Sequence, residues 1–174
     1  METCNNPLIQ YRNQCNSPLL RLAAELRNRI HRFTVREGFI EVFPILHDRK
    51  PQAFGLFMTC RQTHAEASAL IFPLNTFVFQ GPRQIDMFAQ KMEQQNLDNI
   101  RSICLDTVGA WAINTSVGWD KDVPEMRLLP SLDVVHVRRG LDRAYWDSVG
   151  LALRQVTGRM ALEVIFQVEK RWMD

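Results

Sequence analysis

The chain has 174 residues, of which 46% are hydrophobic and 23% charged, and its formal net charge is +2. These values are typical of a globular protein that folds around its own core. The balanced charge gives no general attraction to nucleic acid or to anionic membranes. A membrane span would need a run of about 18 apolar residues, and the sequence has none. We therefore expect neither a nucleic-acid partner nor a membrane partner.

The four cysteines are scattered without a Cys-x-x-Cys pair, and the first 16 residues lack the apolar stretch of a secretory signal. This pattern predicts free thiols in a reducing compartment, so we expect a cytoplasmic or nuclear protein that is not secreted. No glycine-rich phosphate loop occurs, so we expect no cofactor. The cysteines and histidines do not form the two short-spaced pairs of a structural zinc site, so we expect no metal. Residues 1–16 are predicted to be a flexible leader, and residues 17–174 a single domain.

Ser17 and Pro18 predict the start of a helix, because a hydroxyl cap is followed by proline in the first turn. The apolar side chains that follow are three or four residues apart, as on one face of an amphipathic helix. They are Leu19, Leu22, Leu26, Ile30 and Phe33. Two interpretations stay open for this face. Leu19, Leu22, Leu26 and Ile30 either bind a partner, or they pack on the next helix through Cys60, Ala67 and Ile71.

A short strand is expected at residues 39–43, and a second helix is expected from about Ala53 to Phe72, where Pro73 would end it. Cys60 and His64 are four residues apart on this helix and would therefore lie side by side. The pair is a candidate for nucleophilic catalysis or for two metal ligands. A buried structural cysteine beside a satisfied histidine is the favoured alternative.

The remaining chain alternates strands with helices. Strands are predicted near residues 78, 103, 135 and 164, with helices following Pro82 and Leu141. This alternation predicts an α/β fold, with α+β as the alternative, in which residues 76–174 form a short, mostly parallel, repeat-like sheet. The helices of residues 17–75 would pack on it.

Residues 107–130 form the least regular stretch and are predicted to be a functional loop. Asp106 precedes this stretch, and Trp111 and Trp119 within it would wall a pocket at the carboxyl ends of the strands, where open α/β sheets bind ligands. A small-molecule substrate would fit there, so the alternative function is a small enzyme of secondary metabolism, of cyclase or hydrolase type. Solvated acids beside packed tryptophans are the structural explanation of the same residues.

Two segments resemble the signature of a large fungal family, the F-box-like proteins of the two-EXR type. Residues 22–30 contain the motif Glu25-Leu26-Arg27, and residues 60–66 form a second block that residues 75–77 close. The resemblance implies a non-catalytic intracellular interaction module. Its N-terminal helices would dock on the adaptor of a cullin ubiquitin ligase, so that the protein serves as a substrate adaptor.

The chain differs from the family pattern at two positions within the first segment. Ala23 stands where the family usually has proline, and His31 stands where an aromatic residue is common. Proline at the first of these positions would fix the backbone that leads into the helix.

Overall fold

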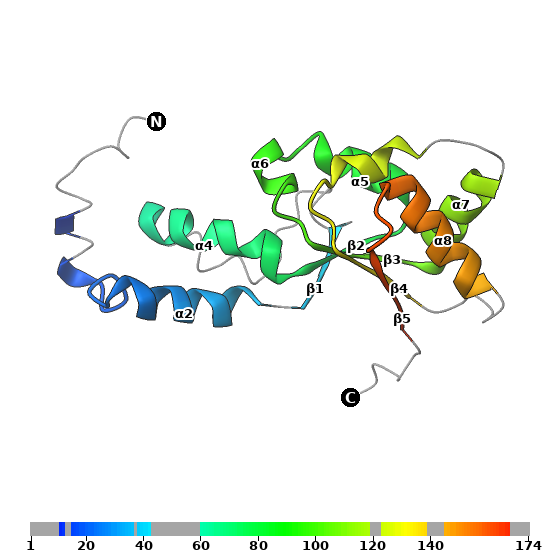
Figure 1. The fold of residues 1–174 in the computed structure, drawn as a ribbon. Helices are drawn as coiled ribbons and strands as arrows, with labels where there is room; N and C mark the ends of the chain where they lie inside the picture. The colour runs from blue at the N-terminus through cyan, green and yellow to red at the C-terminus, as the bar shows by residue number, and fades with distance from the viewer. Residues whose placement is uncertain are drawn as a thin grey trace.

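The computed structural model describes residues 11–12, 15–36, 38–42, 60–118, 123–138 and 145–167. A five-stranded sheet lies at its centre, and its strands are all parallel and follow one another in chain order (Figure 1). The α/β fold with a parallel sheet is therefore confirmed. The strands are β1 (Phe39–Glu41), β2 (Thr76–Phe79), β3 (Ser102–Leu105), β4 (Val134–Val137) and β5 (Glu163–Phe166).

The two faces of the sheet differ in character. Consecutive parallel strands are joined by right-handed crossovers, which place their connections on one face of the sheet. That core face carries a row of aligned residues that are buried beneath the helices, namely Ile40, Phe77, Ile103 and Val135. The opposite face, which we term the open face, carries the alternate residues of each strand. Glu41 is exposed at its β1 edge, while Val78 and Cys104 are buried at its centre.

Short helices cover the core face of the sheet. Phe88 from the first of them contacts Phe77 and Phe79 of β2, with ring centroids 5.6 and 5.7 Å apart. Gly158 follows the helix Trp146–Thr157 and ends it in the left-handed conformation with φ 67°, as glycine commonly does after a helix. The helices are α5 (Pro82–Ala89), α6 (Gln94–Leu97), α7 (Thr107–Gly118), the 3₁₀ helix η3 (Pro124–Leu128) and α8 (Trp146–Thr157).

Two further helices, α2 (Ala24–Val35) and α4 (Arg61–Leu74), lie side by side and extend away from the β1 edge of the sheet (Figure 1). We term this pair the arm. The predicted helix start at Ser17 is wrong, because the Ser17 hydroxyl accepts a bond from Leu20 N at 3.5 Å in a turn that precedes α2. Pro73 lies inside the last turn of α4 and does not end it.

The prediction of a functional loop at residues 107–130 is also wrong. Its first half forms α7, and residues 124–128 form η3, while residues 119–122 lie outside the described residues. The predicted strands near residues 78, 103, 135 and 164 are all present. Most of the predicted leader, at residues 1–10 and 13–14, and the expected beginning of the second helix at residues 53–59 lie outside the described part of the chain.

Candidate functional site

The arm is held together by one carboxylate. Glu66 on α4 accepts hydrogen bonds from Arg27 Nε at 2.9 Å, Arg27 Nη2 at 2.8 Å, Gln62 Nε2 at 2.9 Å and His31 Nε2 at 3.2 Å. The bonds from Arg27 contribute most to lowering the pKa of Glu66 from 4.5 to about 2. Glu66 is therefore ionised at neutral pH, and it joins the two helices through a bidentate ion pair.

His31 lies fully buried between the two helices. Its Nε2 faces the ionised Glu66, so this nitrogen donates to the carboxylate, and Nδ1 is buried without a partner among the described residues. His31 therefore adds one polar contact between α2 and α4.

Asn75 joins the sheet end of the arm to β1. Its side chain is buried, and Nδ2 donates to the carbonyl oxygens of Val35 at 2.8 Å and Ile71 at 2.9 Å. Its Oδ1 accepts from Gly38 N at 3.1 Å. One amide thus satisfies carbonyl groups near the ends of both helices and an N–H at the start of β1, so it fixes the direction of the arm.

These contacts decide which side of α2 faces α4. Arg27, His31 and Val35 recur every fourth residue, and the last two are fully or almost fully buried. The side of α4 that carries Ala67 and Ile71 is buried as predicted. The apolar side of α2 is turned away from it, so the interpretation that this side packs on the second helix is wrong.

The outward side of α2 is an apolar stripe. Leu26 and Phe33 are 51% and 76% exposed, and Ile30 lies between them on the same side and is half-buried. We term these three residues the α2 outer face. Leu19 and Leu22, the other predicted binding residues, are half-buried in the turn that precedes the helix.

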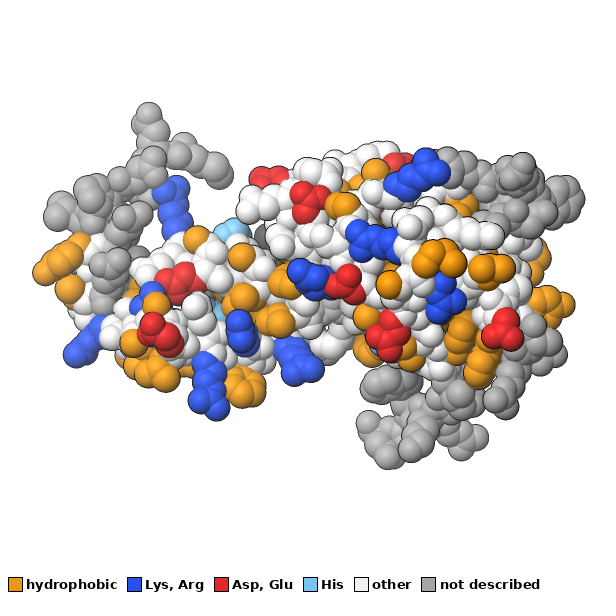
Figure 2. Space-filling model, viewed as in Figure 1, with side chains coloured by type: hydrophobic (Ala, Val, Ile, Leu, Met, Phe, Trp, Pro, Cys, Tyr) orange, Lys and Arg blue, Asp and Glu red, His pale blue; other side chains and the backbone are white. Residues whose placement is uncertain are grey.

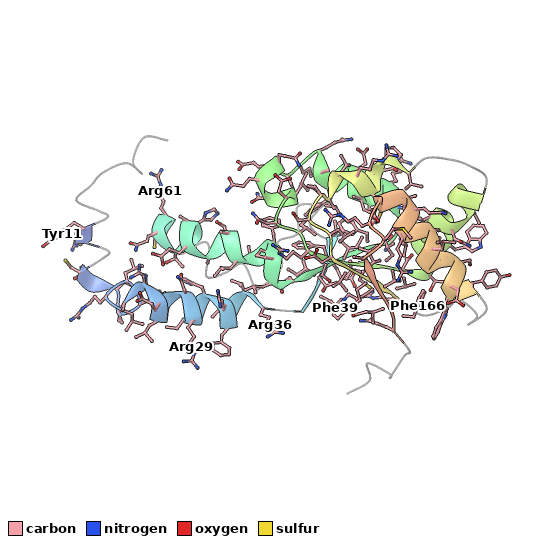
Figure 3. The ribbon with its side chains drawn as sticks, in the orientation of Figure 1. Tyr11, Arg29, Arg36, Phe39, Arg61 and Phe166 are labelled. Carbon is pink, nitrogen blue, oxygen red and sulfur yellow. The ribbon has the colours of Figure 1, made fainter. Side chains whose placement is uncertain are left out.

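Arginines border the α2 outer face. Arg29, Arg32 and Arg36 are exposed on the adjoining side of the helix, where Glu25 is the one acidic residue of α2. Figure 3 shows Arg29 and Arg36 extending away from the ribbon, and the space-filling view shows hydrophobic and arginine side chains next to one another along the arm (Figure 2). The surface is therefore apolar with a basic border.

The predicted pairing of Cys60 with His64 does not occur. Cys60 has an extended backbone and caps α4, with its Sγ 3.1 Å from Thr63 Oγ1 and 3.5 Å from Thr63 N. His64 is exposed on the first turn of the helix. Cys60 is the N-cap of α4 and has an extended backbone, so the four-residue spacing does not place its thiol beside the His64 ring as it would within a helix.

Of the residues of the alternative enzyme site, Asp106 and Trp111 lie in the described part of the chain. Asp106 Oδ1 accepts from Gly109 N at 2.8 Å, so its carboxylate caps the N-terminus of α7. Trp111 is 53% exposed on α7, and Trp119 lies outside the described residues. Within the described ranges, no three His, Cys, Asp or Glu side chains come together as a metal site.

The residues that sequence reasoning missed are the inner ones of the arm. Arg27 and Glu66 belong to the two resembling segments but are 39 positions apart in the sequence, so no local spacing indicates that they pair.

Every helix in the described part of the chain is too short or too polar to cross a bilayer. No family model, curated protein or solved structure matches this chain.

Proposed function

We propose that this chain is a non-catalytic protein-interaction module whose α2 outer face docks on a partner protein, and that the partner is the adaptor of a cullin ubiquitin ligase. The observation that carries the proposal is the exposure of Leu26 and Phe33 on a helix that is anchored through its opposite side. The partner class comes from the F-box-like resemblance of residues 22–30.

The exposed side chains are costly to leave in water. Burial of a leucine or phenylalanine side chain contributes about 1.5–3 kcal/mol, and residues spaced as Leu26, Ile30 and Phe33 are those by which an amphipathic helix enters a groove. The helix is already held by Arg27, so docking requires no further ordering of its backbone. Such preorganisation favours affinity.

The basic border of the α2 outer face favours partner grooves with an acidic rim. Arg29, Arg32 and Arg36 would meet the rim of the partner, and an acidic rim would attract them while a basic one would repel them. A second copy of this helix would bring arginines against arginines. The border therefore favours a different, acidic protein over self-association through α2.

The experiment is a titration of the purified ligase adaptor against the full chain, with Phe33→Asp and Leu26→Asp as test variants. Met160→Asp is the matched control, because Met160 is 73% exposed in the turn after α8 and lies outside the arm. Truncation of a central anchor costs about 2 kcal/mol, or roughly 30-fold in Kd. We expect this loss for Phe33→Asp and an unchanged Kd for Met160→Asp. Failure of the unaltered chain to bind the adaptor, or equal effects of test and control variants, would overturn the proposal.

A further inference from the structure

Strand β5 forms one edge of the sheet, and half of its backbone groups face outward. Glu163 N donates to Asp133 O and Gln167 N donates to Val137 O, each at 3.0 Å, so the odd-numbered residues bond to β4. A parallel ladder uses alternate residues of a strand. The N–H and C=O groups of Val164 and Phe166 therefore point to the open edge, away from β4.

Within the described residues, this edge carries few of the features that usually protect an outer strand. Natural edges are shortened or carry lysine, proline, a bulge or an inward charge. β5 has four residues with Glu163 exposed at its start, but Val164, Ile165 and Phe166 are β-branched or aromatic and half-buried. The opposite edge is different, because β1 has three residues and its exposed Glu41 forms an ion pair with Arg138 at 2.8 Å. The β5 edge is thus suited to receive another strand.

We propose that β5 pairs with β5 of a second copy of this chain, in an antiparallel arrangement whose two-fold axis passes between the two Ile165 residues. Val164 then lies opposite Phe166 of the second copy, and Phe166 lies opposite its Val164. Each opposed pair exchanges two N–H···O bonds. Among two-fold registers, this one pairs every outward N–H and C=O group of Val164 and Phe166. The pairing joins the two five-stranded sheets into a single sheet of ten strands.

The side chains fit the same register. Glu163 lies opposite Gln167 of the second copy, and the two Glu163 residues do not oppose each other. Gln167 Nε2 lies 3.3 Å from His136 Nδ1 of its own chain, and the second hydrogen of the amide can be donated to the carboxylate. Ile165 meets Ile165 on the open face, and Val164 meets Phe166 on the core face, where Phe166 already stacks on Trp146 with centroids 5.0 Å apart. These contacts involve no residue of the α2 outer face, so the inference is independent of the proposed function.

The first measurement is the molar mass of the full chain in solution by sedimentation. An interface of one strand pair is small, so the protein should be sampled from roughly 10 µM to 1 mM. We expect the mass to rise from 20.2 kDa toward twice that value. Hydrogen exchange at Val164 and Phe166 should slow as the concentration rises, while exchange at Ile165 stays constant. A monomer at every concentration would overturn the proposal.

A charge exchange tests the register. Gln167→Glu places the introduced carboxylate opposite Glu163 of the other copy, and this happens at two symmetry-related places in the dimer. We expect at least 10-fold weaker association. Adding Glu163→Lys to that variant should restore association, because an ammonium group would then oppose each introduced carboxylate. Positions 163 and 167 are about 13 Å apart along one strand, so rescue requires pairing between copies. A double variant as weak as Gln167→Glu, or association unaffected by either change, would show the pairing to be wrong.

Discussion

Glu66→Gln tests whether one carboxylate holds the arm together. The substitution keeps the size of the side chain but removes the charge that Arg27 and His31 meet. The pKa of Glu66 is lowered from 4.5 to about 2, and this difference corresponds to about 3 kcal/mol of stability at neutral pH. Arg27 is only 14% exposed, so it would lose its partner in a poorly hydrated place. We expect a loss of about 3 kcal/mol, or roughly 6–12 °C in Tm for a chain of this size.

The assay is denaturant unfolding of both proteins at several pH values. The folded pKa of Glu66 lies below its unfolded value, so its contribution is complete above pH 4.5 and is lost as the pH falls toward 2. The difference between the two proteins should therefore be constant near neutrality and shrink between pH 5 and pH 3. Glu25→Gln, an exposed change in the same motif, should stay within about 0.5 kcal/mol. A Glu66→Gln protein as stable as the unaltered one at pH 7 would refute the reasoning.

Two backbone predictions can be measured in the same unfolding assay. Ala23 has φ −57°, within the range of proline, so Ala23→Pro should raise stability by about 0.5 kcal/mol, and a lowered stability would contradict this. A Cβ on Gly109 would lie 2.7 Å from Gln80 O and 3.0 Å from Gly81 Cα, so Gly109→Ala should cost about 1–3 kcal/mol. Its control is Gly150→Ala in α8, where the nearest atom is a flexible Arg154 nitrogen at 3.4 Å and no loss is expected.

The sheet was predictable because its signals are local. Each strand is a short β-rich run bounded by turn residues, and helical periodicity between the runs requires parallel pairing. The helix at residues 107–118 was missed because it carries no charged residue and has glycines at Gly109 and Gly118, so it lacks a polar side that would define a period. Gly109 is required there by the close approach of Gln80, which only the fold reveals.

The orientation of α2 was not predictable from its own pattern. Periodicity identified Leu26, Ile30 and Phe33 as one face, and an amphipathic helix usually buries such a face. Here the inward side carries Arg27 and His31, because Glu66, which is 39 positions from Arg27 in the sequence, supplies their partner. A largely buried arginine is stable only with such a partner, and single-sequence reasoning has no means to locate it.

The inner contacts of the arm also bear on what the two resembling segments do. Arg27, Glu66 and Asn75 are three of the polar residues in those segments, and each of them forms hydrogen bonds inside this chain. These three side chains hold the fold together, so they are not offered to a partner. In the docking that we propose, the partner contacts come from Leu26 and Phe33, which are exposed. Docking would then use the side of α2 opposite to the one that folding uses, and variants of one side should leave the other role intact.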